Sequence, residues 1–339
     1  MQKLILVLLL SLSTSFAHAD QIITKDGQKL TATFMMPTGT PKAAVLILQG
    51  SGNVDLDGEV SGPFLGNPYL GQSGKLSLQL AEHLAAQGMA TLRFSKRGVE
   101  DAIQLPNQKF PFLVDDAKSA FQLMVEKFPS LKHGVIGFSE GAMVASLMSD
   151  EMAVDGLFLL APLTRPIDSV FGYQFIEWPT KLVMDHMAAI SVNEEFKLPF
   201  LGASLKALDS NKDGKISTQD ELMPAYQNYY FAVRGLLGTP ALSGWYESLK
   251  ALPSFAEIGA KMKSPAVFVY QGMEDAQMNW LWALEDAHVY PVKPTLHFYL
   301  GVGHCFSPMD GLMGEVKTSG PYASEMLDQL GKDIVETLK

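Results

Sequence analysis

Short apolar segments recur along most of the chain and alternate with segments of helical spacing. Seven segments predict strands, at residues 31–36, 44–48, 89–94, 134–138, 156–161, 266–270 and 295–300. Four predict helices because their apolar residues recur three and four positions apart, at residues 73–87, 114–128, 140–148 and 322–338. Apolar strands that alternate with helices are typical of a mostly parallel sheet with helices on both faces. The pattern therefore predicts an α/β fold.

Residues from about 163 to 250 interrupt this alternation. They are helical by pattern, rich in aromatic residues and Met, and contain no clear strand. A chain of 339 residues can hold two domains, or one large α/β domain with an insertion. We therefore expect a helical cap at 163–250, inserted into a catalytic domain formed by 20–162 and 251–339.

The N-terminus has the pattern of a targeting segment. Lys3 gives a positive start, residues 4–10 are an unbroken apolar run, and Ala17-His18-Ala19 offers a small-x-small cleavage site. The apolar run is too short to span a bilayer. We expect a signal peptide at residues 1–19 and a periplasmic or secreted protein without a membrane segment after cleavage. An uncleaved N-terminal anchor is the alternative.

Composition narrows the range of partners. The chain has 26 Lys and Arg against 36 Asp and Glu, a net charge of −10, which argues against a nucleic-acid-binding surface. The single cysteine, Cys305, excludes an internal disulfide and a zinc site built from cysteines. Small neutral substrates and metal cations remain open, and so does the oligomeric state.

The segment Gly137-Phe138-Ser139-Glu140-Gly141 matches the G-x-S-x-G pattern. It lies between a predicted strand and a predicted helix, which is the context that a nucleophilic serine on a sharp turn requires. Small flanking residues avoid clashes at such a turn, and the helix N-terminus favours negative charge. Ser139 is therefore the candidate nucleophile, and an ordinary glycine-rich turn is the alternative.

A nucleophilic serine needs a base, and the base needs an orienting acid. Of the later histidines, His304 lies in a glycine-containing loop just after the last predicted strand and is the candidate base. His186, His288 and His297 fall in the cap, in a polar connection and inside a strand. The loop after the strand at 266–270 offers Asp275 as the acid, with its neighbour Glu274 as the alternative.

Several short motifs together resemble those of the α/β-hydrolases, in the branch of secreted esterases and dienelactone-hydrolase-like proteins. They are Gly50-Ser51-Gly52 with Asp57, Arg93-Phe94-Ser95-Lys96-Arg97-Gly98, Ser139-Glu140-Gly141, Gly272 to Asp275, and Gly303-His304. The resemblance covers about 20–162 and 251–339. It implies an α/β-hydrolase fold and an oxyanion hole formed by the backbone N–H groups of Ser51 and Glu140.

Two departures from that branch concern the oxyanion loop. Gln49 stands where His is usual, and Asn53-Val54-Asp55 replaces a usual Pro-Gln-Asp. For the charged residues nearby, Asp55, Asp57 and Arg97, we expect turn hydrogen bonds and an ion pair rather than a catalytic role.

The cap contains a segment that fits the calcium loop of an EF-hand. Hard oxygen ligands fall at the required spacing, with one from a backbone carbonyl, in Asp209, Asn211, Asp213, Lys215, Ser217 and Asp220. Gly214 occupies the position of the sharp turn. Asp220 stands where Glu is usual, which weakens calcium binding and favours Mg²⁺ as an alternative. We expect a structural Ca²⁺ site, with a solvated turn as the other interpretation.

These observations predict a secreted serine hydrolase that cleaves small-molecule acyl esters through an acyl-enzyme and uses no catalytic cofactor. A thioesterase or peptidase on the same triad is the second hypothesis. A non-catalytic calcium-dependent binding protein is the third. Aromatic residues of the cap would line an acyl pocket or form the cap core: Phe171, Tyr173, Phe175, Trp178 and Trp245.

Overall fold

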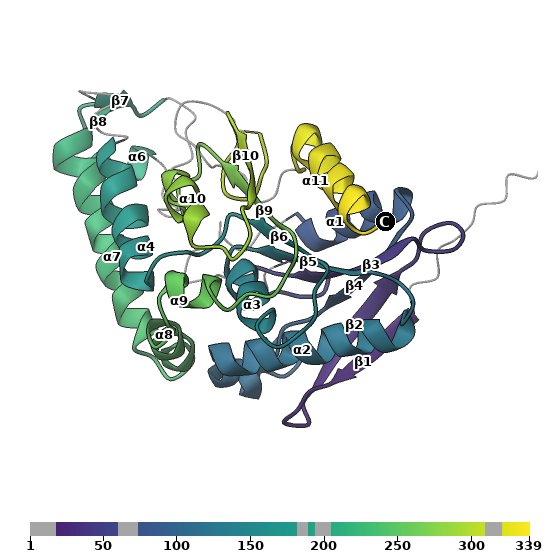
Figure 1. Ribbon diagram of the computed structural model, residues 1–339. Helices are drawn as coiled ribbons and strands as arrows, with labels where there is room; N and C mark the ends of the chain where they lie inside the picture. The colour runs from purple at the N-terminus through teal and green to yellow at the C-terminus, as the bar shows by residue number, and fades with distance from the viewer. Residues whose placement is uncertain (1–17, 60–73, 182–188, 194–204, 309–320) are drawn as a thin grey trace, which may run out of the picture.

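The computed structural model describes residues 18–59, 74–181, 189–193, 205–308 and 321–339 (Figure 1). At its centre lies an eight-stranded sheet with the strand order β1-β2-β4-β3-β5-β6-β9-β10. The strands are β1 (His18–Ile23), β2 (Lys29–Met35), β3 (Ala43–Leu48), β4 (Met89–Phe94), β5 (His133–Phe138), β6 (Gly156–Leu160), β9 (Val267–Gly272) and β10 (Thr295–Tyr299). β2 pairs antiparallel with β1 and β4, and the other pairs are parallel. The expected mostly parallel sheet is present.

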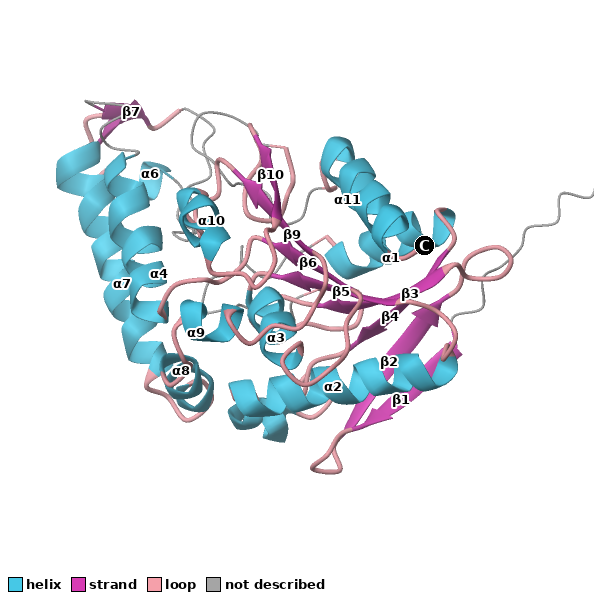
Figure 2. Ribbon diagram, in the orientation of Figure 1, coloured by secondary structure: helices cyan, strands magenta, loops and turns pink. Residues whose placement is uncertain are grey.

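Helices cover both faces of the sheet, as Figure 2 shows. Because side chains alternate along a buried strand, β3 contributes to two separate apolar clusters. Ala43, Val45 and Ile47 pack with α1 (Leu76–Ala86) and α11 (Ser324–Thr337). Ala44, Leu46 and Leu48 pack with α2 (Phe110–Lys127) and α3 (Glu140–Met148). Both faces of the sheet are thus buried against helices, which explains the continuous apolar runs in the sequence.

Strand β1 is not predicted by the apolar pattern. Among the residues of this strand whose burial is described, 20–23, only Ile22 belongs to the core, and Ile23 is 57% exposed, so the strand has little hydrophobic signal. Pairing with β2 defines it. Its first two residues, His18 and Ala19, belong to the predicted signal peptide, and the rest of that prediction lies outside the described residues.

The segment between β6 and β9 is mainly helical, as expected for the cap. Its elements are α4 (Ile167–Gly172), η2 (Tyr173–Glu177), β7 (Ala189–Ser191), α6 (Leu205–Leu208), β8 (Lys215–Ser217), η3 (Thr218–Leu222), α7 (Met223–Leu237), α8 (Ser243–Lys250) and α9 (Phe255–Gly259). The expectation of no strand is wrong, because β7 and β8 form a small antiparallel pair. Figure 1 shows α4, α7 and α8 gathered at one side of the molecule.

Shorter helices complete the described part of the chain: η1 (Ala102–Asn107), α10 (Leu281–Glu285) and η4 (Asp286–His288). In the described ranges, no helix is both long enough and apolar enough to cross a membrane.

Candidate active site

Ser139 lies at a strained turn between β5 and α3. Its φ of 53° and ψ of −115° are unusual for a residue with a side chain. A Cβ atom at Gly137 would lie 2.4 Å from the carbonyl oxygen of Gly141, and one at Gly141 would lie 2.4 Å from that of Leu48. The two glycines of the motif are therefore required by close backbone packing. This packing places Ser139 at the carboxyl end of β5.

Asp275 and His304 meet across two loops that follow neighbouring strands. The Nδ1 atom of His304 donates to Oδ2 of Asp275 at 2.8 Å, and both side chains are buried. The Asp275 carboxylate also accepts hydrogen bonds from the Gln271 side chain at 2.7 Å and from the backbone N–H groups of Gln277 and Met278 at 2.7 and 2.9 Å. With Nδ1 as the donor, Nε2 of His304 is the ring nitrogen that can accept a proton.

The other candidate residues do not occupy this position. His304 bonds Asp275 and not the alternative acid Glu274. His297 lies 2.9 Å from Asp333, and Nδ1 of His288 contacts the carbonyl oxygen of Glu285 at 2.7 Å. His186 lies outside the described residues.

Ser139 and His304 line the same cavity, whose volume is about 120 Å³. Asp275 lies behind His304 and does not line it. The walls come from both the cap and the catalytic domain and are mainly apolar: Ile47, Leu48, Leu76, Leu80, Phe138, Leu163, Ile167, Val170, Phe171, Phe175, Tyr229, Trp245, Leu249, Met278 and Tyr322. Of the aromatic residues predicted for an acyl pocket, Phe171, Phe175 and Trp245 are in this lining.

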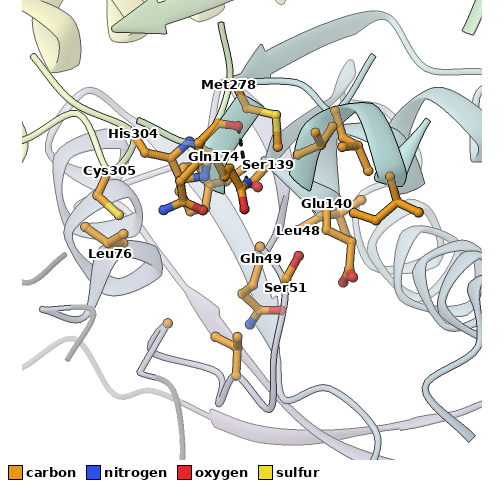
Figure 3. Close-up of a pocket in the computed structure, with 18 of the residues that line it drawn as sticks. Leu48, Gln49, Ser51, Leu76, Ser139, Glu140, Gln174, Met278, His304 and Cys305 are labelled. Carbon is orange, nitrogen blue, oxygen red and sulfur yellow. Dashed lines mark hydrogen bonds between the residues drawn. The ribbon is translucent and has the colours of Figure 1, made fainter. Parts of the chain in front are cut away.

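The remaining two predicted aromatic residues have other roles. Tyr173 donates its hydroxyl proton to the carbonyl oxygen of Asp275 at 2.9 Å, and Trp178 packs in the core. Cys305 is buried and also lines the cavity. Figure 3 shows its sulfur beside Leu76, on the far side of His304 from Ser139.

The loop after β3 passes directly against Ser139. A Cβ atom at Gly50 would lie 3.0 Å from the Phe138 ring and 3.5 Å from Cβ of Ser139. Ser51 and Glu140 line the cavity together with Ser139 (Figure 3). Glu140 is the first residue of α3, so its N–H group has no partner within the helix. The two residues whose backbone N–H groups are the predicted oxyanion donors thus line the same cavity as Ser139.

Gln49 holds the oxyanion loop in place. Its amide nitrogen donates to the carbonyl oxygens of Asp55 at 2.9 Å and Phe94 at 2.6 Å. The Asp55 carboxylate accepts the N–H groups of Asp57 and Glu59, both at 2.9 Å. Gln49 therefore has a structural role, at the position where His is usual in the esterase and dienelactone-hydrolase-like branch.

The charged residues near the loop form ion pairs, as expected. Asp57 contacts Arg93 at 2.5 Å. Arg97 is fully buried and bonds Asp116 at 2.5 and 2.7 Å and Asp26 at 3.0 Å. These contacts fix the loops that carry the site.

The sequence does not predict a buried polar contact that lies beside Ser139. The Glu140 carboxylate accepts hydrogen bonds from Nζ of Lys96 and, at 2.5 Å, from Nε1 of Trp245. Lys96 also donates to the carbonyl oxygen of Gly50 at 2.5 Å. Lys96 and Glu140 both belong to the motifs quoted above, but these residues lie 44 positions apart and Trp245 lies 105 positions from Glu140, so spacing alone gives no sign of the contact.

The candidate calcium loop, residues 209–220, follows α6, contains β8 and ends within η3. Side-chain oxygens of Asp209, Asn211 and Asp213 accept backbone N–H groups of the loop at 2.8 to 3.2 Å. Oδ2 of Asp220 contacts Oγ of Ser217 at 3.1 Å. The neighbouring Glu221, which the sequence analysis does not single out, accepts hydrogen bonds from two backbone N–H groups of the loop.

Glu221 binds the N–H of Ser210 at 2.7 Å and that of Ser217 at 2.9 Å. The hydrogen bond from the Ser210 hydroxyl is the main reason why the pKa of Glu221 is lowered. Over the described ranges, no group of three or more His, Cys, Asp or Glu residues is arranged to hold a metal ion. The six predicted ligands are not among the described residues that line the active-site cavity.

A comparison with known families identifies the chain. The model of a hydrolase family described as "Serine aminopeptidase, S33" matches residues 70–281, more than half of the sequence. The chain belongs to this family. The matched region contains Ser139 and Asp275, whereas His304 lies beyond it.

Relatives of this S33 family protein include esterases. Esterase EstD of Thermotoga maritima is 26% identical over 224 residues, which are 65% of this chain and 47% of EstD. The chain thus matches about half the length of that relative. An esterase structure from Pyrococcus furiosus has a TM-score of 0.53 at 15% identity, and covers 96% of this chain and 92% of its own. A dienelactone hydrolase structure from Anabaena variabilis has a TM-score of 0.52 at 13% identity, with 96% and 99% coverage. These likenesses and the strand order confirm the α/β-hydrolase fold.

Proposed function

We propose that this protein is a serine hydrolase that cleaves carboxylic esters. The observation that carries the proposal is the shared cavity of Ser139, on its strained turn, and His304, whose Nδ1 is held 2.8 Å from the buried Asp275. The esterase names of the relatives from T. maritima and P. furiosus support it.

In the proposed mechanism, Oγ of Ser139 attacks the ester carbonyl while Nε2 of His304 accepts its proton. The backbone N–H groups of Ser51 and Glu140 bind the oxyanion of the tetrahedral intermediate. His304 then donates the proton to the leaving alcohol, which gives an acyl-enzyme. Water, deprotonated by His304, attacks the acyl-enzyme and releases the acid and Ser139. Asp275 holds the imidazole in the required tautomer and stabilises its charged form.

The cavity lining favours neutral, apolar acyl groups over free amino termini. An aminopeptidase must recognise an α-ammonium group, for which a carboxylate is the natural partner. Among the described lining residues, Glu140 has the one acidic side chain, and that carboxylate is already bonded to Lys96 and Trp245. The family name keeps peptide hydrolysis as a second candidate, and thioester hydrolysis would use the same groups.

The test combines a fluorophosphonate label with a substrate panel. We expect the wild type to be labelled on Ser139 and to hydrolyse nitrophenyl esters from acetate to laurate faster than aminoacyl nitroanilides. Ser139→Ala should lose the label and about 10⁴-fold or more of the turnover while it stays folded. Faster cleavage of the nitroanilides would favour a peptidase. A folded wild type that neither reacts with the label nor cleaves any substrate would point to the non-catalytic calcium-dependent binding protein.

We also propose that the cap loop binds Ca²⁺ as a structural ion, with Mg²⁺ as the alternative. The residue types of the loop support this proposal, because they offer carboxylate, amide, hydroxyl and carbonyl oxygens and a glycine at φ 83° where the loop must turn: Asp209, Asn211, Asp213, Lys215, Ser217 and Asp220. The ion would hold α6 and β8 together. It would supply no group to the triad.

Thermal unfolding tests this second proposal. A dissociation constant of roughly 10⁻⁴ M would add about 1.4 kcal/mol at about 1 mM free calcium, a shift of a few degrees. Asp209→Ala combined with Asp213→Ala should abolish the shift. Equal melting temperatures of the wild type in calcium, magnesium and chelator would contradict the proposal and favour the other interpretation, a solvated turn.

Export is the third part of the proposal. It rests on the charge, apolar run and small-x-small pattern of residues 1–19. Expression of the full chain in a bacterium should give a periplasmic or extracellular protein that begins at Asp20, as determined by N-terminal sequencing. A cell-associated protein that retains Met1 would contradict it.

A further inference from the structure

A chain of buried polar contacts joins the cap to the oxyanion loop. Glu140 is 1% exposed, and its carboxylate binds both the Lys96 ammonium group and the Trp245 indole N–H. Lys96 in turn donates to the carbonyl oxygen of Gly50 at 2.5 Å. Trp245 belongs to helix α8 of the cap, so cap, nucleophile helix and oxyanion loop meet at one cluster.

The contact with Gly50 fixes the direction of the neighbouring N–H group. The carbonyl of Gly50 and the N–H of Ser51 belong to the same peptide unit, and the peptide bonds of the described chain are trans. In a trans peptide these two groups point in opposite directions. Gly50 and Ser51 line the cavity and Lys96 does not, so Lys96 lies behind the loop. The Ser51 N–H is therefore directed to the cavity side of the loop, the side on which Ser139 lies.

The charge of Lys96 also acts on the strength of this donor. An ammonium group bonded to a carbonyl oxygen polarises the whole peptide unit, which makes its N–H a stronger hydrogen-bond donor. A buried ammonium group is stable only when it is paired, and Glu140 supplies the partner. Trp245 satisfies the second carboxylate oxygen and so holds Glu140 in the orientation that Lys96 needs.

We propose that Lys96 is a positioning residue that orients the Ser51 N–H towards the oxyanion. Glu140 and Trp245 make this arrangement depend on the contact between the cap and the catalytic domain. The inference rests on the proposed ester hydrolysis and goes beyond it. It assigns a function to the Lys of the R-F-S-K-R-G segment and to the side chain of the residue that follows the nucleophile.

The test compares kinetics and inhibitor binding for wild type, Lys96→Met, Lys96→Arg and Trp245→Phe. For Lys96→Met we expect about a 100-fold decrease in kcat, as for the loss of one oxyanion donor, with KM changed little. The affinity for a trifluoromethyl ketone should fall by a similar factor, because Ser139 adds to its carbonyl carbon, His304 takes the proton, and the carbonyl oxygen becomes an oxyanion. The pH dependence of kcat/KM should keep its shape, since Asp275 and His304 are untouched. Lys96→Arg should recover part of the loss.

Lys118→Met is the matched control. Lys118 forms a surface ion pair with Glu151 at 2.6 Å, away from the cavity, so its kinetics and ketone affinity should equal those of the wild type. If Lys96→Met does not fold, Trp245→Phe decides, because it removes the indole N–H and keeps an aromatic side chain at this position. Its kcat and ketone affinity should fall in parallel.

An active wild type whose folded Lys96→Met variant keeps its kcat and ketone affinity would overturn the inference and leave the proposed function intact. If Lys96→Met does not fold, unchanged kcat and ketone affinity in Trp245→Phe would likewise overturn the inference and leave the proposed function intact. A wild type without esterase activity would overturn the proposed function itself.

Discussion

At the scale of single residues, hydrogen bonds hold both oxygens of the Asp275 carboxylate. Within the described part of the chain, four hydrogen bonds reach it, from Gln271, Gln277, Met278 and His304. All four come from N–H donors, so the position requires an acceptor on both oxygens. An amide at this site would set its own NH₂ group against at least one of these donors.

Asp275→Asn should therefore reduce kcat by about 10⁴-fold, because the imidazole loses the partner that selects its tautomer. Glu274→Gln, one position earlier, is the matched control and should retain nearly full activity. Steady-state kinetics on nitrophenyl butyrate measure both. A larger loss in Glu274→Gln than in Asp275→Asn would assign the acid to Glu274.

The glycines of the nucleophile turn allow a second comparison. Gly141→Ala would place a methyl group 2.4 Å from the carbonyl oxygen of Leu48, and these are backbone atoms that can move only with the strand. Gly172→Ala, at the end of α4, meets no atom within 4 Å. Gly141→Ala should lower both the melting temperature and turnover, whereas Gly172→Ala should raise stability by about 0.5–1 kcal/mol. Equal melting temperatures for the two variants would contradict this explanation of the motif.

At the scale of elements, a buried arginine ties three of them together. Arg97 follows β4 and bonds Asp116 on α2 and Asp26 in the turn between β1 and β2. Hydrogen bonds from Arg97 and Thr24 lower the pKa of Asp26 to about 2. Asp116 bonds the same guanidinium, but burial raises the pKa of Asp116.

The lowered pKa of Asp26 makes its contribution to stability depend on pH. An acid whose pKa is lower in the folded state stabilises the fold above its unfolded pKa, near 3.9, and loses this effect as the pH falls towards 2. Asp26→Asn should thus reduce the free energy of unfolding at pH 7 by on the order of 1 kcal/mol, a discounted figure because the side chain is 40% exposed. Urea unfolding at pH 7, 5 and 3 measures the difference between variant and wild type. The difference should shrink between pH 5 and 3, and a difference that grows with acid would refute the assignment.

The elements that the sequence predicts well are those whose signal is local. β4 and α3 have the expected bounds because apolar composition and periodicity define them. The pattern does not predict β7 and β8, because each has three residues and is defined by its partner. The same division applies to the site. The G-x-S-x-G turn is readable from five adjacent residues, but the contact of Glu140 with Lys96 and Trp245 depends on three segments that only the fold brings together.

At the scale of the whole molecule, the cap and the catalytic domain share one hydrophobic core. Phe171, Tyr226 and Trp245 of the cap belong to the same buried cluster as Leu48 and Met143. A polar contact adds to this, since the Phe110 N–H donates to the Ser248 hydroxyl at 3.0 Å. A cap that unfolded alone would expose part of the core of the catalytic domain.

Calorimetry should therefore show a single unfolding transition for cap and catalytic domain together. Its calorimetric enthalpy should match the van't Hoff enthalpy, which is the sign of one cooperative unit. Any shift caused by calcium should move this whole transition. Two resolved transitions, of which calcium moves only the first, would show that the cap is an independent unit.

The order of the strands also has a consequence for synthesis. β6 pairs with β9, but Leu160 and Val267 are separated by the whole cap. While the ribosome adds these roughly 100 residues, at about 5–20 residues per second, one edge of the entirely buried β6 has no partner for on the order of 5–20 s. An unpaired strand edge of this kind is a site at which other nascent chains can form β-sheet hydrogen bonds. Asp275 and His304 come later still, so the nucleophile is made first and gains its acid and base only when the last strands join the sheet.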